Sequence, residues 1–136
     1  MIEGRCLCGA AGWRLDGDPE GTTICNCSIC RRYGAIWAYG HLGQELTPWG
    51  ETAAFATGEK SCDFHHCAVC GCVTHYLARW SYEDGRTKCA VNLRMADDPQ
   101  AIRDLKIFHF EGAISMEDVV PDETGTVARH VRDLWL

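Results

Sequence analysis

Three cysteines lie within six residues in the segment CNCSIC, at Cys25, Cys27 and Cys30. Cysteine thiolates are soft ligands for zinc, and a Cys-x-x-Cys turn brings two sulfur atoms within reach of one ion. Three protein ligands leave one position of a tetrahedral ion open, which is typical of catalytic zinc. The segment therefore predicts a zinc site whose fourth position can take a thiol or an aldehyde oxygen, with the three cysteines as catalytic ligands.

Four further cysteines form two tight pairs, Cys6-x-Cys8 and Cys67-x-x-Cys70. Two pairs complete one tetrahedron, and a saturated four-sulfur site is structural. Counting ligands in this way predicts two zinc ions per chain, one structural and one catalytic. The structural ion would close a loop of about sixty residues that contains the three-cysteine segment. Because metal binding of this kind supplies folding free energy, we expect metal removal to unfold the chain.

Other interpretations of the three-cysteine segment stay open. A fourth side chain could close the site and make it structural, or the thiols could be redox-active, or the site could hold no metal. For the cysteines outside the groups we favour burial as small hydrophobic residues. The candidates for a fourth ligand are Cys62, Cys72, His65 and His66.

Composition limits the function classes. The chain has 136 residues, a net charge of −6 and no apolar run long enough to span a membrane, so neither nucleic acid nor a membrane is an expected partner. The N-terminal segment MIEGRCLCG lacks the basic and apolar regions of a secretory signal, which predicts a cytoplasmic protein. In that reducing compartment clustered cysteines bind metals more often than they form disulfides. The length favours a single domain over residues 1–136.

The elements that must position these cysteines are mainly strands. Short apolar runs bounded by glycine, proline or aspartate are typical of a β domain. Two short helices are expected, one beginning at Asp98 as N-cap with Pro99 in the first position, and one over residues 124–136. The predicted strands cover residues 10–15, 35–42, 52–58, 73–80, 87–95 and 105–110.

The spacing of these cysteines resembles the family of glutathione-dependent formaldehyde-activating enzymes, which also includes centromere protein V. The resemblance is carried by the stretches GRCLCGAAGWRL, CNCSICRRYGA, FHHCAVCGCVTHY and VNLRM, in family order. It implies a mainly β fold of the β-tent type, with several small bent antiparallel sheets around two zinc sites and few short helices. It also implies the same division of ligands, with Cys6, Cys8, Cys67 and Cys70 around the structural ion.

The activity implied by the resemblance is a carbon–sulfur lyase reaction, the addition of the glutathione thiol to formaldehyde or its reverse. Arg31 directly follows the trio of Cys25, Cys27 and Cys30, and its guanidinium suits a carboxylate such as those of glutathione. Arg32 is as readily expected to pair with an acidic residue of the chain. His75 could move a proton near neutral pH, but a single strand histidine is more often structural. Ser28 is expected to hydrogen-bond a thiolate or to cap a turn.

Two alternatives to an enzyme remain, a non-catalytic zinc module that binds a protein partner and a thiol-based sensor. The trio discriminates among the three, because an enzyme needs an exchangeable fourth position, a module needs a closed one, and a sensor needs thiols that oxidise reversibly. The sequence does not define the oligomeric state. The aromatic residues near these motifs are read as core residues more readily than as pocket walls; they are Tyr33, Trp37 and Trp80.

Overall fold

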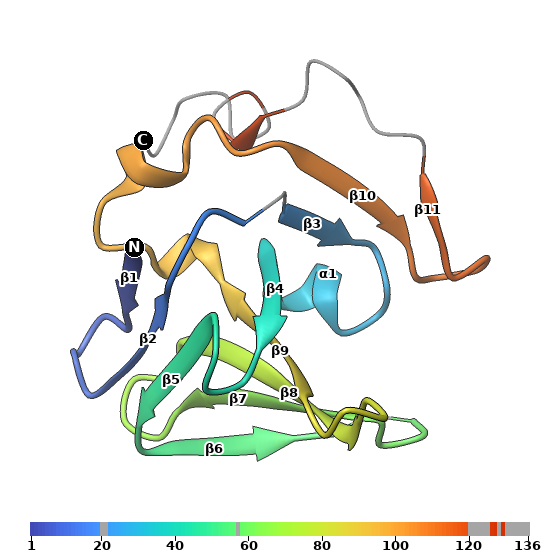
Figure 1. Ribbon diagram of the computed structural model, residues 1–136, viewed down its shortest axis with the longest axis horizontal. Helices are drawn as coiled ribbons and strands as arrows, with labels where there is room; N and C mark the ends of the chain where they lie inside the picture. Colours follow the sequence, from blue (N-terminus) through green and yellow to red (C-terminus); the bar gives the residue numbers. More distant parts are fainter. Residues whose placement is uncertain (20–21, 57, 120–125, 128, 130–136) are drawn as a thin grey trace.

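The structure, a computed structural model, describes residues 1–19, 22–56, 58–119, 126–127 and 129. These residues form two β-sheets and very little helix, which confirms the prediction of a mainly β protein with more than one sheet (Figure 1). The strands are β1 (Ile2–Arg5), β2 (Ala11–Leu15), β3 (Thr22–Cys25), β4 (Trp37–His41), β5 (Leu46–Gly50), β6 (Thr52–Phe55), β7 (Cys62–Cys67), β8 (Val73–Ser81), β9 (Thr87–Asn92), β10 (Ile107–Glu111) and β11 (Glu117–Val119).

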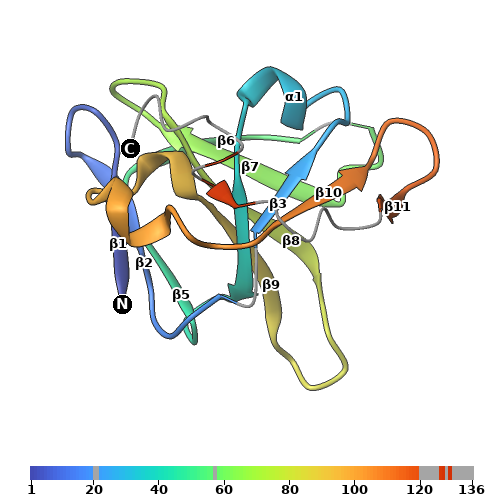
Figure 2. The same ribbon diagram turned by 90° about the horizontal axis from the view of Figure 1, so that it is seen from above.

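The smaller sheet has the strand order β1-β2-β5, and the larger has the order β11-β10-β3-β4-β9-β8-β7-β6. The smaller sheet flanks one side of the molecule, and β10 arches over the side opposite β6 (Figures 1 and 2). Most neighbours are antiparallel, as expected. The exception is β10, which runs parallel to β3 and places Phe110 opposite Cys25. This parallel pairing brings residues from the C-terminal third of the chain beside the three-cysteine segment.

Each of the six expected strands coincides with an observed one, β2, β4, β6, β8, β9 and β10. The expected strand over residues 87–95 is too long, because β9 ends at Asn92 and the 3₁₀-helix η1 (Leu93–Met95) follows. The Asn92 side chain accepts a hydrogen bond from the backbone N–H of Arg94, so it caps this helix and ends the strand.

The expected helix at Asp98 is a single 3₁₀ turn, η2 (Pro99–Ile102). Asp98 caps it as predicted, because its side chain accepts from the N–H of Gln100 at 2.9 Å. The expected helix over residues 124–136 lies almost wholly outside the described residues. Of its apolar positions the structure describes Val127, which is fully buried in the main core.

The two faces of the larger sheet pack in different clusters. On β9, Cys89 and Val91 belong to the main core with Trp13, whereas Ala90 faces the other way, since strand side chains alternate. The cluster around Ala90 contains Cys25 and Cys30 together with the aromatic residues Trp37, Phe64 and Tyr76. Tyr39, Ala90, Tyr76 and Phe64 are register partners in turn across β4, β9, β8 and β7. The sheet therefore presents one aromatic row to the three-cysteine segment.

Candidate metal centres and the cavity beside them

The side chains of Cys6, Cys8, Cys67 and Cys70 converge, with all four sulfur atoms within 4.8 Å of one another. The Cys6 and Cys8 sulfurs are 3.5 Å apart, and the Cys8 and Cys67 sulfurs are 3.6 Å apart. A tetrahedral zinc ion with bonds of ~2.3 Å has sulfur–sulfur edges of ~3.8 Å. The donor set therefore fits a four-sulfur metal ion with small adjustments.

Two similar turns build this group. In the first, the N–H of Cys6 bonds to the carbonyl of Ala11 and the N–H of Ala11 bonds to the Cys6 sulfur. In the second, the N–H of Cys67 bonds to the carbonyl of Cys72 and the N–H of Val69 bonds to the Cys67 sulfur. Each turn thus supplies one buried and one exposed thiol, and each buried sulfur is oriented by a backbone N–H hydrogen bond.

The four-cysteine group lies where the two sheets meet. Cys6 and Cys8 lie in the turn from β1 to β2 in the smaller sheet, and Cys67 ends β7 in the larger sheet. The register of β7 with β8 shifts between His65 and His66, just before Cys67. The unpaired residue is Thr74 on β8, which is the pattern of a β-bulge and bends β8 opposite the end of β7. A metal bound here would fasten the two sheets together across 59 residues of sequence.

The sulfurs of Cys25, Cys27 and Cys30 also lie within 4.8 Å of one another. Cys25 ends β3, Cys27 lies in the following turn, and Cys30 begins α1 (Cys30–Tyr33). This helix of four residues was not predicted, because one turn is too short to show helical periodicity. It ends at Gly34, whose φ of 62° is in the left-handed region that glycine adopts without strain.

Each sulfur of the trio accepts at least one N–H hydrogen bond. The N–H of Cys27 bonds to Cys25, the N–H of Cys30 bonds to Cys27, and the indole Nε1–H of Trp37 bonds to Cys30, each at 3.4 Å. Such bonds stabilise thiolates and fix their direction, which is what metal ligands require. The hydrogen bond from Cys30 lowers the pKa of Cys25 to about 6, and the same shared proton, with burial, raises the pKa of Cys30.

Gly112, which follows β10, closes over the trio. A Cβ atom at this position would lie 2.6 Å from the Cys25 sulfur and 3.0 Å from the Cys27 Cβ. No side chain fits at these distances, so glycine is required here by close approach. The sequence held no signal for this contact, because the parallel pairing of β10 with β3 creates it.

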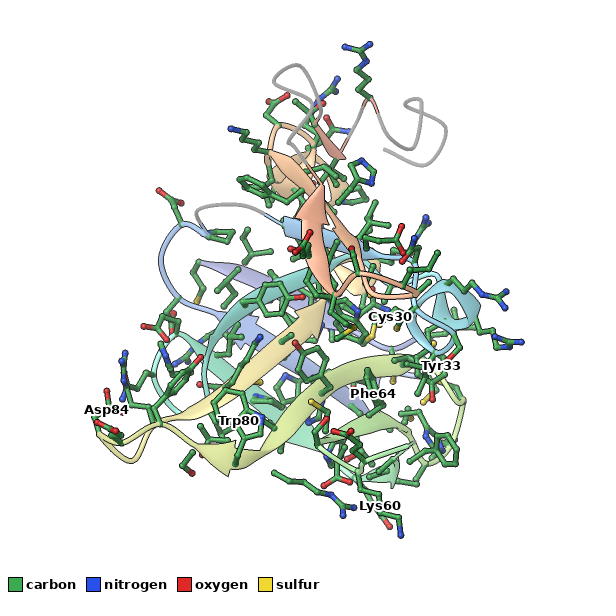
Figure 3. All side chains as sticks on the ribbon, turned by 90° about the vertical axis from the view of Figure 1, so that its right-hand side faces the viewer. Cys30, Tyr33, Lys60, Phe64, Trp80 and Asp84 are labelled. Atoms are coloured by element: carbon green, nitrogen blue, oxygen red, sulfur yellow. The ribbon has the colours of Figure 1, made fainter. Side chains whose placement is uncertain are left out.

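The trio opens onto a cavity of about 410 Å³, within the ~300–1,000 Å³ range of small-molecule sites. All three cysteines line it, and five of the other eleven lining residues are aromatic. In Figure 3 the labelled Tyr33 and Phe64 lie next to Cys30, while Trp80 lies apart from them. The cavity is lined by Cys25, Cys27, Ser28, Ile29, Cys30, Trp37, Tyr39, Ser61, Cys62, Phe64, Tyr76, Lys88, Phe110 and Met116.

No fourth His, Cys, Asp or Glu of the described residues joins the trio within 4.8 Å. His65 instead bonds to the Thr52 hydroxyl at 2.9 Å, and the backbone of Cys72 belongs to the four-cysteine turn. Cys62 packs against the aromatic cluster, so the expectation of hydrophobic packing holds in part, but it is half-buried and also lines the cavity. Cys89 is fully buried in the core, as expected.

The structure separates the two arginines from the cavity wall. Arg31 is exposed and lines a smaller pocket of about 260 Å³ on another side of Cys25 and Cys30, together with Arg94. Arg32 donates from Nη1 to the carbonyl of Ser28 at 2.7 Å and so caps the turn. The role of Arg31 in binding a substrate remains a prediction.

His75 is a buried structural residue. Its Nδ1 lies 2.7 Å from the Thr74 hydroxyl, and its ring stacks on His65 with centroids 4.4 Å apart. Burial, with the neighbouring His65, lowers the pKa of His75 to about 3. An imidazole that stays neutral and outside the cavity lining does not fit a proton carrier for the trio, so the structural alternative is favoured.

Lys88, Tyr39 and Tyr76 line the cavity and were not singled out from the sequence. Burial raises the pKa of Tyr39 to about 12 and that of Tyr76 further, so both phenols stay neutral. They lie on three neighbouring strands whose order in the sheet is not written in the sequence. The aromatic and basic residue types were visible, but nothing in the spacing connected them with the cysteines.

Two sheets joined by a four-cysteine group, with a three-cysteine group beside a cavity, define a cysteine-rich β protein with two candidate metal centres. The family model of the glutathione-dependent formaldehyde-activating enzyme matches residues 1–110, and the chain belongs to this family. The matched region contains all seven clustered cysteines. The family is enzymatic, and its name couples glutathione with formaldehyde.

A similar fold occurs in the crystal structure of a Rhodobacter sphaeroides protein, with a TM-score of 0.58 and 24% sequence identity over 77% of this chain and 98% of that chain. At this identity the likeness bears on the fold. A comparison with curated proteins found no match. Within the described residues, no helix combines the length and apolar character that crossing a membrane requires.

Proposed function

We propose that this protein is a zinc-dependent carbon–sulfur lyase that acts on a glutathione-like thiol and a small aldehyde, through an adduct such as S-hydroxymethylglutathione. The observation that carries the proposal is the opening of the three-sulfur group onto a cavity of about 410 Å³. Three thiolates with one direction left free, beside a hollow of this size, are what an exchangeable ligand needs. A structural metal site with four protein ligands does not need a cavity beside it.

In this proposal Cys25, Cys27 and Cys30 hold one zinc, and the four-cysteine group holds another. Zinc held by these three cysteines would supply the activation of a bound thiol, because coordination to zinc lowers the pKa of a thiol enough to give a thiolate at neutral pH. The reaction forms one carbon–sulfur bond, R–SH + H₂C=O giving R–S–CH₂–OH, and the thiol proton finally resides on the new hydroxyl. Reversal breaks the same bond.

The residues of the chain orient the ligands and receive the developing charge. The three N–H donors to the trio hold the sulfurs in one direction. The aromatic residues give the cavity a largely apolar wall, and electrostatic interactions are stronger beside such a wall than in bulk water. The phenols of Tyr39 and Tyr76 remain protonated and hydrogen-bond to each other, with Tyr76 as the donor, so the Tyr39 hydroxyl keeps a proton that it can donate to the aldehyde oxygen as it becomes negative.

The test is carbon-13 NMR of formaldehyde and glutathione with catalytic amounts of zinc-loaded protein. We expect faster exchange between formaldehyde and the hydroxymethyl adduct than without protein. Cys30→Ser is the control, since it should fold and keep the four-sulfur site. Equal exchange rates for the wild-type and Cys30→Ser proteins would refute the reaction proposed here.

A further inference from the structure

Lys88 places a fixed positive charge on the cavity wall. Among the described residues that line the cavity, no other Lys, Arg, Asp or Glu is present. Lys88 lies on β9 two residues before Ala90, and alternate residues of a strand share a face. Ala90 packs in the cluster that holds Cys25 and Cys30. The strand therefore directs Lys88 to the same side as the trio.

A neighbouring ring supports the Lys88 ammonium. Its Nζ lies 4.7 Å from the centroid of the Tyr39 ring, which lines the same cavity. A cation over an aromatic face is attracted to it, but this contact leaves N–H donors available for an anion. The ring thus positions the ammonium beside the hollow.

No carboxylate of the described residues forms an ion pair with Lys88. The chain has 19 acidic and 13 basic residues, so carboxylates are plentiful. Other surface cations of the chain use them, for example Arg79 with Asp63 and Arg86 with Asp84, at 2.7 Å in each case. A half-buried lysine that faces a cavity without such a partner is arranged to receive an anion from outside.

We propose that Lys88 is the specificity-determining residue of the cavity, binding a carboxylate of the thiol substrate and so selecting thiols that carry a carboxylate over neutral thiols. This inference rests on the proposed function. It assigns the carboxylate contact inside the cavity to Lys88, whereas the pocket lined by Arg31 lies outside that wall. A charge-assisted hydrogen bond is roughly twice as strong as a neutral one, which is strong enough for such selection.

The experiment compares two small thiols, 3-mercaptopropionate and neutral 2-mercaptoethanol, binding to zinc-loaded protein in isothermal titration calorimetry. We expect Lys88→Met to weaken 3-mercaptopropionate roughly tenfold or more, as loss of a hydrogen bond to a charged group does, and to leave 2-mercaptoethanol unchanged. Lys88→Arg should keep the preference, because the charge remains.

Lys106→Met is the matched control. Its Nζ also lies over a ring, 5.1 Å from the centroid of Phe108, but Lys106 does not line the cavity. We expect this variant to bind both thiols as the wild type does. Circular dichroism and zinc analysis of each variant show that the fold and both metals are kept.

The outcomes separate the two proposals. If Lys88→Met weakens the binding of both thiols equally, the ammonium acts by balancing the negative charge of the metal site, and the assignment of specificity to Lys88 is overturned. If neither thiol is affected, it is overturned as well. Selective binding that depends on Lys88, without any acceleration of adduct formation in the NMR assay, would uphold Lys88 as the anion contact while the proposed reaction falls.

Discussion

The indole Nε1–H of Trp37 donates a hydrogen bond to the sulfur of Cys30 at 3.4 Å. Trp37 is the first residue of β4, and its ring also packs edge-on against Tyr76 with centroids 5.1 Å apart. One side chain therefore holds a candidate metal ligand and forms part of the cavity wall. The candidate site and the aromatic cluster are thus one packed unit.

Replacing Trp37 by Phe keeps an aromatic ring and removes the N–H donor. Loss of a hydrogen bond to a ligand typically lowers metal affinity by about 10–100-fold. We expect zinc at the three-cysteine group to be lost at lower chelator concentrations than in the wild type, while zinc at the four-cysteine group stays bound. Competition with a chromophoric chelator measures both. Trp49→Phe, at a partly exposed indole outside the cavity lining, is the control. Unchanged release from Trp37→Phe would contradict a role for this bond.

Cys67→Ser and Cys30→Ser should differ in kind. The first opens the four-sulfur group that joins the two sheets, and structural zinc contributes ~10 kcal/mol or more of apparent folding free energy. We expect Cys67→Ser to be unfolded or very poorly expressed. Cys30→Ser should show native circular dichroism and about one zinc per chain instead of the two expected for the wild type. Similar melting curves for both variants would mean that the ligands are divided differently.

Gly112→Ala tests the close approach of β10 to the trio. The added methyl group would lie 2.6 Å from the Cys25 sulfur, so either that sulfur or the backbone must move. We expect zinc to bind about tenfold or more weakly at the three-cysteine group, because misplaced ligands bind poorly. Zinc titration measures this, with the exposed neighbour Ala113→Ser as control. Wild-type affinity in Gly112→Ala would show that the segment yields without cost.

Buried His75 should make stability depend on pH. Its pKa is about 3 in the folded protein and near the ordinary 6.5 in the unfolded chain. Above pH 6.5 the His75 imidazole is neutral in both the folded and the unfolded protein. Below pH 6.5 it takes up a proton in the unfolded chain but not in the folded protein, so the free energy of unfolding decreases as the pH is lowered from 6.5 to 3. The loss is about 1.4 kcal/mol per pH unit.

Urea denaturation at several pH values checks this expectation. His75→Gln should flatten the fall between pH 6.5 and 5 relative to the wild type, whereas protonation of the zinc thiolates is common to both proteins. His41→Gln controls for the loss of an imidazole, since His41 instead pairs with Glu45 at 3.0 Å. Parallel profiles for the wild type and His75→Gln would show that burial of His75 does not set the pH dependence.

Local signals in the chain were enough for the cysteine groups and for much of the β structure. Candidate ligands such as Cys25, Cys27 and Cys30 are close in sequence, so one short turn brings their sulfurs together. Strand alternation is also local, which is why the six expected strands are all found. The family resemblance rests on the same local spacings and is confirmed by the match over residues 1–110.

The wall around the trio depends on strand order, which no local pattern encodes. Lys88, Cys62 and Trp37 lie on three different strands of the larger sheet, and Gly112 follows a fourth strand that pairs in parallel with β3. Which strands become neighbours is decided by burying the apolar faces of the whole chain together, and that packing is a property of the tertiary fold. For this reason the candidate metal ligands can be identified in the sequence, whereas the residues that line the cavity beside them are identified only in the folded protein.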